Sequence, residues 1–313
     1  MRLRMGALRI LAGVAVLAAL ANGTRGQAPA SKPVAVVDGE VITQADLDAL
    51  LKGRGPTPVA LPENTRRQMQ MEALAMIIDD ILLQKFLKQK GPRIDPAEVD
   101  KRLAELAEAL KRQGKTLQDF YRESGQTEAE VRNAQTLMLQ WAAYVRARIT
   151  DADLKRYYDE NRDFFDQVKV RASHIVFRLP PGTLEEERKA ARDKLLALRQ
   201  EIVSGKLDFA AAAAKYSQCP SAQNGGDIGT FPRKFVVDEA IAKAAFALAV
   251  GQVSDVVETE FGLHLIKVTE RHPGQPSDFQ KVKEDVRAMC AEELRQSLLT
   301  ELRKTTKVEI NLP

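Results

Sequence analysis

Hydrophobic and polar residues follow a helical period in two long parts of the chain and a strand period between them. Over residues 63–90 the apolar side chains recur three or four positions apart, which predicts one long helix. Residues 168–177 and 261–268 instead alternate apolar and polar side chains and are rich in β-branched residues, which predicts two strands. Residues 279–302 return to the helical period. The pattern therefore indicates a mainly helical part and a smaller part that contains a sheet.

Two further strand patterns lie at the ends of the helical part. Asp38-Gly39 separates two short apolar runs, and this dipeptide is a strong signal for a two-residue hairpin turn. Residues 307–310 also alternate, but a single strand is not stable alone. We therefore expect the tail to add a strand to the hairpin. The expected division is a helical lobe of residues 33–165 plus 274–313, with a domain of residues 168–271 inserted in it.

Polar residues before several helical patterns predict helix N-termini, where a side-chain oxygen accepts a hydrogen bond from the first turn. The predicted caps are Thr43, Asp95, Thr127, Thr150, Thr183 and Ser277. Inside the inserted domain we expect helices over residues 183–205, 208–216 and 239–247. An antiparallel pair of strands over residues 253–257 and 263–269 should complete it. This order of strand, helices and strands indicates an α+β domain.

The first 28 residues predict a secretory signal peptide and a polar linker. Arginines precede the apolar run of residues 10–20, and the small residues that follow, Ala19-Leu20-Ala21, fit a cleavage site. The run is short for a membrane span, and an uncleaved anchor is the alternative. We expect contact with the membrane only transiently, through the signal, then secretion across the inner membrane and a periplasmic location.

Charge and cysteine content narrow the classes of partner. Much of the net charge of +4 lies in the arginines of the signal, and no basic, aromatic-rich patch follows, so no nucleic-acid partner is expected. The chain has only two cysteines, Cys219 and Cys290, in different expected domains. We expect no disulfide between them, and Cys290 should behave as a small hydrophobic residue on its helix.

Two of the three histidines lie on the predicted strands of the inserted domain. Because side chains alternate across a strand, His174 and His264 each share a face with apolar residues, whereas His272 is expected in a Pro/Gly linker. One inward histidine is more often a hydrogen-bonded core residue than a catalyst. Two of them with Cys219 between indicate a polar site, which could serve a thiol nucleophile, a metal or a non-covalent reaction.

The residues around these positions resemble the parvulin (PpiC) family of peptidyl-prolyl cis/trans isomerases. The resemblance rests on motifs that occur in the family's order, namely Ala172-Ser-His174-Ile, Tyr216-Ser, Pro220-Ser-Ala, Asn224-Gly-Gly-Asp-Ile-Gly-Thr-Phe231, Ala245-Phe-Ala-Leu248, Gly251-Gln-Val-Ser254 and Thr259-Glu-Phe-Gly-Leu-His264. The flanking helices resemble the chaperone lobe of SurA-type and PrsA-type foldases. The implied fold is a parvulin domain, a small sheet with helices, inserted in a mainly α-helical chaperone domain.

The resemblance implies a catalytic group of His174, Cys219, His264 and Thr259, with Thr259 bonding to both imidazoles. It implies a proline pocket lined by Ile228, Phe231, Val236, Val237 and Ile241. It also implies rotation of X-Pro bonds without a covalent intermediate, a metal or a cofactor. The expected partners are unfolded or proline-containing polypeptides.

The sequence departs from the family in ways that affect the site. Many bacterial relatives carry Asp in place of Cys219, and the family's pocket methionine and phenylalanine are here Val236 or Val237 and Ile241. The loop of residues 178–183 lacks the basic cluster of phosphate-directed relatives, so acidic substrates are not expected. The alternative function is a chaperone whose parvulin domain binds peptides but barely catalyses. A thiol hydrolase is disfavoured, because no nucleophile-elbow pattern occurs.

Overall fold

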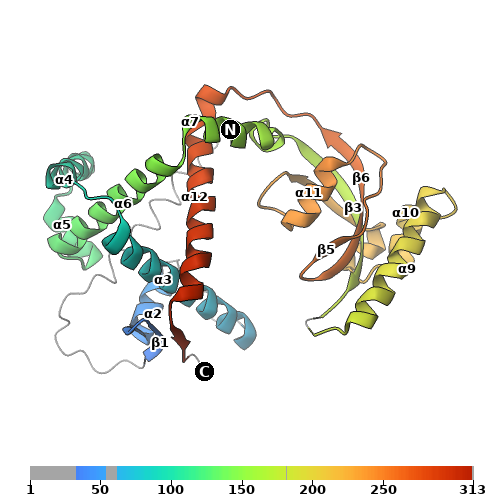
Figure 1. The fold of residues 1–313 in the computed structure, drawn as a ribbon, viewed down its shortest axis with the longest axis horizontal. Coiled ribbons are helices and arrows are strands. Elements are labelled where there is room, and N and C mark those ends of the chain that lie inside the picture. Colours follow the sequence, from blue (N-terminus) through green and yellow to red (C-terminus); the bar gives the residue numbers. More distant parts are fainter. Residues whose placement is uncertain (1–32, 54–61, 181, 312–313) are drawn as a thin grey trace. The chain divides into compact units, whose positions relative to one another are not determined.

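The computed structural model describes residues 33–53, 62–180 and 182–311. Its described residues form two compact units (Figure 1). One unit contains the described residues up to Leu154 and from Glu284 onward, and the other is Lys155–Lys283. The expected signal peptide and linker of residues 1–28 lie outside the described residues. Within the described ranges, no helix is long and apolar enough to cross a membrane.

The sheet of the first unit joins strands from the two ends of the chain. β1 (Pro33–Val37) and β2 (Glu40–Thr43) form the predicted hairpin, and β7 (Val308–Ile310) pairs antiparallel with β1. Asp38 and Gly39 have φ values of 49° and 82°, as the mirror-image hairpin turn requires. The predicted addition of the tail to this hairpin is therefore confirmed, and β1 becomes the central strand in the order β2-β1-β7.

Helices form the rest of the first unit. They are α2 (Gln44–Gly53), α3 (Glu63–Lys90), α4 (Pro96–Lys111), α5 (Leu117–Ser124), α6 (Glu128–Arg148), the start of α7 (Asp151–Glu160) and most of α12 (Phe279–Thr305). The main core contains Leu47 of α2, Ile77 of α3, Leu137 of α6 and Leu299 of α12 together with the inner face of the sheet. The long predicted helix and the caps at Asp95 and Thr127 are confirmed.

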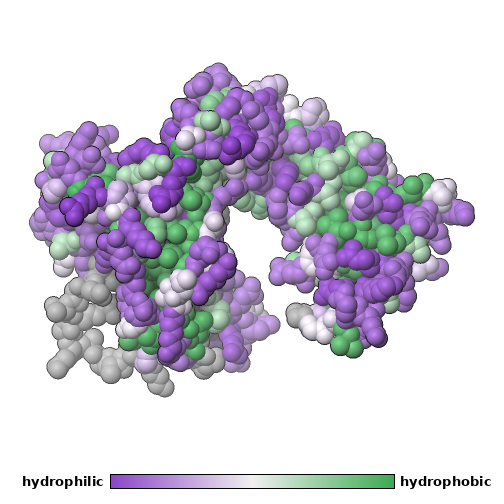
Figure 2. All heavy atoms as spheres, viewed as in Figure 1, coloured by the Kyte–Doolittle hydropathy of each residue, from purple (hydrophilic) through white to green (hydrophobic). Residues whose placement is uncertain are grey.

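The second unit is an α+β domain built on an antiparallel four-stranded sheet in the order β4-β3-β6-β5. Its elements are α7 from Lys155 onward, α8 (Arg162–Phe165), β3 (Lys169–Arg178), α9 (Glu185–Val203), α10 (Phe209–Tyr216), the 3-10 helix η1 (Pro220–Asn224), β4 (Asp227–Pro232), α11 (Glu239–Ala247), β5 (Val257–Thr259), β6 (Gly262–His272) and the first residues of α12. α9 and α10 cover one face of the sheet, and α11 covers the other (Figure 1). Figure 2 shows hydrophobic residues gathered over this sheet, bordered by hydrophilic ones.

The structure corrects the expected strands of this unit. The strand expected over residues 253–257 is wrong, because β5 begins at Val257 and Val253 forms only one bridge, with Lys267. β4 is a further strand that the sequence pattern did not predict: it carries Gly229, which interrupts its alternation, yet it pairs with β3. His272 ends β6 opposite Lys169 and does not lie in a linker.

Two predicted caps are also wrong. The Thr183 hydroxyl donates to the carbonyl of Pro180 at 2.6 Å, and α9 begins after Leu184 without a side-chain cap. At α12, Asp278 rather than Ser277 accepts from the first turn, at 2.9 Å from the amide of Gln280. A local sequence pattern could not reveal that Ser277 has a distant partner.

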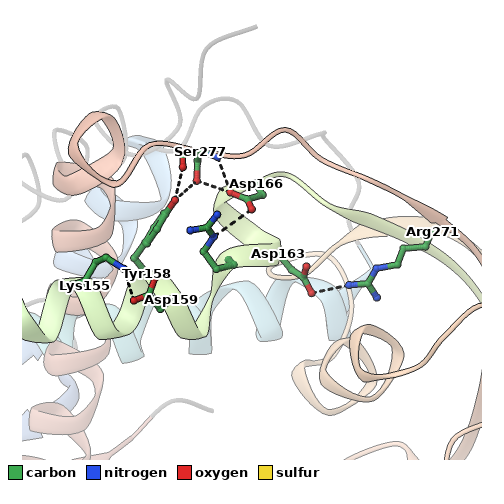
Figure 3. Close-up of polar contacts among 8 residues, drawn as sticks. Lys155, Tyr158, Asp159, Asp163, Asp166, Arg271 and Ser277 are labelled. Atoms are coloured by element: carbon green, nitrogen blue, oxygen red, sulfur yellow. Dashed lines mark hydrogen bonds and ion pairs between the residues drawn. The ribbon is translucent and has the colours of Figure 1, made fainter.

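Ser277 instead ties the connection between β6 and α12 to the segment before β3. The amide and the hydroxyl of Ser277 both donate to the carboxylate of Asp166, at 2.8 and 2.7 Å (Figure 3). The Ser277 hydroxyl also forms a hydrogen bond with the Tyr158 hydroxyl, at 2.9 Å. Arg271 donates to Asp163 at 2.9 Å. These contacts lie within Lys155–Lys283, so the structure groups residues 155–165 with the inserted unit, whereas the sequence placed them with the helical lobe.

Candidate functional site

The register of β3 against β6 brings the two strand histidines together. His174 lies opposite Ile266, and Val176 lies opposite His264, so the imidazoles are diagonal neighbours on one face of the sheet. Their ring centroids are 5.5 Å apart, with 36° between the ring planes. The two residues are only 8% and 2% exposed. The predicted pairing of inward imidazoles is thus present in the fold.

The polar contacts of the two rings are unequal. The Nε2 atom of His264 lies 2.9 Å from the hydroxyl of Thr259, which also accepts the amide of Phe261 at 3.1 Å. Within the described part of the chain, both ring nitrogens of His174 and Nδ1 of His264 are buried without a hydrogen-bond partner. The expectation that Thr259 bonds to both imidazoles is therefore wrong. Three imidazole nitrogens are instead without a hydrogen-bond partner among the described residues.

Burial keeps both imidazoles uncharged near neutral pH. It lowers the pKa of His174. Burial also lowers the pKa of His264 from 6.5 to about 4; the neighbouring His174 lowers it further, and Asp238 opposes the shift. A neutral imidazole has one donor and one acceptor nitrogen. The pair can therefore both donate and accept hydrogen bonds without placing a charge in the site.

Cys219 lies in the segment that joins α10 to η1, and its thiol is free and partly exposed. This segment is bound to β3 beside the histidine. The Ser217 hydroxyl accepts the amide of Val176 at 3.1 Å, and the amide of His174 donates to the carbonyl of Gly226 at 2.8 Å. A Cβ atom at Gly226 would lie 2.3 Å from the carbonyl oxygen of His174, so only glycine permits this close approach. Sequence reasoning missed the anchoring by Ser217.

Apolar side chains form a cluster on the same face of the sheet as the histidines. Phe231 and Ile241 are buried in the cluster that contains Ile266, the strand neighbour of His174. Val237 is partly buried against this cluster, as is Ile228. Four of the five predicted pocket residues are thus together. Val236 is the exception, because its side chain is 62% exposed.

Arg171 of β3 joins the strands on either side of it, β4 and β6, and sequence reasoning did not single it out. Its guanidinium donates to Asp227 at 2.7 Å and to Glu270 at 3.1 Å. Asp227 also accepts the amide of Gly229 at 2.9 Å, and these bonds lower the pKa of the Asp227 carboxyl. The bonds fix the start of β4, which carries Ile228. An Arg on a strand and an Asp after Gly-Gly were the only available signals.

No group of three or more His, Cys, Asp or Glu side chains in the described ranges is arranged to hold a metal ion.

Comparison with known proteins gives the same assignment as the motifs. Residues 174–270 match the family model of the PPIC-type PPIase domain, or rotamase. The chain is 32% identical over 249 residues to the foldase protein PrsA of Geobacillus sp. (strain WCH70), covering 79% of each chain. It is 41% identical over 114 residues to the peptidyl-prolyl cis-trans isomerase Pin1 of Malus domestica, covering 32% of this chain and 93% of that one.

Among solved structures, a peptidylprolyl isomerase (PrsA) from Bacillus anthracis is 22% identical, with a TM-score of 0.43. The alignment covers 73% of this chain and 96% of that chain. The family assignment rests on the sequence relationship and on the domain match. The chain belongs to the PrsA foldase family, and its residues 174–270 are a peptidyl-prolyl cis/trans isomerase domain of the PpiC type.

Proposed function

We propose that this isomerase rotates X-Pro bonds at the site formed by His174, His264 and Cys219, with the proline ring against Phe231 and Ile241. One observation carries the proposal. Two neutral, buried imidazoles with unpartnered nitrogens share a sheet face with an apolar cluster. A prolyl peptide offers complementary groups, because its ring is apolar and its carbonyls accept hydrogen bonds.

The reaction needs only preferential binding of the twisted amide. Rotation about the C–N bond breaks amide resonance and has a barrier of about 18–20 kcal/mol. In the twisted state the nitrogen and the carbonyl are decoupled, and the C–N bond is single-like. Each tenfold acceleration requires about 1.4 kcal/mol of extra binding in that state. Desolvation in an apolar pocket and one polar group near the carbonyl can supply several such factors.

The side chains divide this work. Ile228, Val237 and the two buried pocket residues exclude water from the proline ring. Cys219 is the polar group near the substrate carbonyl, and it forms no covalent bond with the substrate. Thr259 orients His264, and the neutral imidazoles accept or donate hydrogen bonds without a charge that would favour the planar, more polar amide.

The clients are polypeptides, as they are for a foldase. The helical unit, made of the described residues up to Leu154 and from Glu284 onward, binds unfolded chains while the inserted unit acts on their prolines. The arginines and the apolar run of residues 10–20 support action outside the cytoplasm, on secreted or outer-membrane proteins. We place the protein in the periplasm.

The test is the isomerisation rate of a short proline peptide with the full-length chain. Cys219→Ala should lower kcat/KM by about tenfold, the equivalent of one contact of about 1.4 kcal/mol. Cys219→Asp should lose less, because a polar group is kept at that position. Cys290→Ala is the matched control, since the only other cysteine lies on α12. If Cys219→Ala and alkylation of Cys219 both leave the rate unchanged, the assignment of the site to this segment is wrong.

A further inference from the structure

The loop between β4 and α11 holds a phenylalanine in an unfavourable backbone conformation. Phe235 has a φ of 73°, in the left-handed region, and its side chain is 81% exposed. A bulky residue rarely adopts this region, at a cost of about 1–3 kcal/mol. Exposure of the ring gives no burial energy in return. Folding alone therefore does not explain a phenylalanine at this position.

The loop is held at both ends, so its conformation is defined. Arg233 forms two hydrogen bonds with Glu239, at 3.0 and 2.6 Å. Lys234 donates to the hydroxyl of Tyr157 at 3.1 Å and lies 5.2 Å from the centre of its ring. The side chain of Asp238 accepts the amide of Ala240 at 2.8 Å and caps α11. These contacts also occupy the charged groups beside Phe235, which leaves an apolar surface.

Phe235 continues an aromatic row that begins on α7 and α8. Its ring meets Phe164 edge-on, with centroids 5.7 Å apart. Phe164 contacts Phe165 at 5.3 Å, and Phe165 contacts Tyr157 at 6.4 Å. Phe165 is buried and Phe164 is half-buried, so the row has a fixed base and an exposed end at Phe235. All these residues belong to the inserted unit.

The exposed end is continuous in the chain with the proline pocket. Val237 packs against the cluster of Phe231 and Ile241, whereas Phe235 and Val236, two residues and one residue earlier, face solvent. Neighbouring Cα atoms in a peptide are 3.8 Å apart. Client residues next to a proline bound at Phe231 and Ile241 are therefore close enough to contact Phe235 and Val236.

We propose that Phe164, Phe235 and Val236 form a second substrate subsite, which binds an apolar or aromatic side chain of the client near its proline. The inference rests on the proposed function, because the proline pocket sets where the client chain runs. The occupant is a stretch of unfolded polypeptide, which exposes such side chains. The strained backbone turns Phe235 outward, so the ring meets the client and not the core. The subsite selects among prolines by the apolar character of their neighbours.

The test compares proline peptides that differ only in one neighbour of the proline, Phe or Ser, placed two residues before or two residues after it. The full-length chain should show a higher kcat/KM for a Phe peptide. Phe235→Ala should reduce the Phe-to-Ser ratio by about three- to tenfold, as expected for loss of one aromatic contact. The position of Phe at which the ratio changes shows on which side of the proline the subsite lies. Leu184→Ala, which removes another exposed apolar side chain, should leave the ratio unchanged.

Two further variants, Cys219→Ala and Phe235→Asn, distinguish failure of the proposed isomerase site from failure of the subsite. Cys219→Ala should lower the rates of both peptides and leave their ratio unchanged; if it alters neither rate, the proposed function fails. Phe235→Asn suits a positive φ, so it should melt no lower than the parent and yet lose the preference for Phe. If Phe235→Ala and Phe235→Asn keep the parent ratio while Cys219→Ala still lowers both rates, the subsite is refuted and the isomerase site stands.

Discussion

Acidification from pH 7 to pH 4.5 should destabilise the unit that contains the paired histidines. The pKa of His264 is lowered from 6.5 to about 4, mainly by burial. The imidazole of the unfolded chain therefore takes up a proton near pH 6.5, whereas that of the folded chain stays neutral until about pH 4. Between these values the unfolded state binds more protons, so the free energy of unfolding decreases as the pH falls.

The size of the loss follows from the two pKa values of His264. Each unit of difference between the folded and unfolded pKa corresponds to about 1.4 kcal/mol. His264 can therefore change the free energy of unfolding by at most about 3 kcal/mol. Solvent screening reduces it to about 1–3 kcal/mol. Burial also lowers the pKa of His174, which acts in the same direction. The loss should be complete below the folded pKa and absent above the unfolded one.

Amide hydrogen exchange of β6 measures this loss locally in the full-length chain. The parent and His264→Gln are compared at the same pH, so the intrinsic exchange rate cancels. Carboxylates such as Asp227, whose pKa is lowered, titrate in both proteins and cancel as well. Between pH 7 and pH 4.5, the parent should lose about 1–3 kcal/mol more protection than the variant. Exchange in α3, in the other unit, is the internal control. Equal pH dependence in the two proteins would refute the reasoning.

Three further outcomes are expected. Thr259→Val should leave Nε2 of His264 buried without a partner and cost about 1–3 kcal/mol in β6 exchange, whereas Thr259→Ser, which keeps the hydroxyl, should cost less; equal losses would show that the hydrogen bond is not involved. Ile241→Ala should open a cavity in the pocket cluster and lower the free energy of unfolding by about 2–5 kcal/mol, and a loss under 1 kcal/mol would place Ile241 outside the packed core. Ending the chain after Thr305 removes β7, so limited proteolysis of the first unit should quicken while the isomerase rate persists; unchanged proteolysis would make the tail dispensable.

Local patterns were sufficient for elements whose signals lie within a few residues. Asp38-Gly39 can adopt the positive φ values of a hairpin turn, and the structure contains that turn. Thr127 forms the expected capping box because its partner, Glu130, is three residues away. The helical period over Glu63–Lys90 corresponds to α3 from its first to its last residue. In these cases the physical cause and the sequence pattern occupy the same short segment.

Local patterns did not predict the features that depend on partners far away in the chain. β4 is a strand because β3 pairs with it, although Gly229 interrupts its alternation. Serine is a residue type that often caps helices, but the amide and hydroxyl of Ser277 bind Asp166, which lies far away in the chain. A residue with several possible partners takes the one that the tertiary fold brings to it.

The sequence by itself determined the candidate residues of the site and the strand faces of His174 and His264. Only the tertiary structure decided which of them meet. The register of β3 and β6 made the imidazoles neighbours, and Thr259 reached His264 alone. Packing buried Val237 and left Val236 in solvent beside a strained Phe235. Register and packing depend on the simultaneous fit of distant segments, and residue order specifies that fit only through the whole fold.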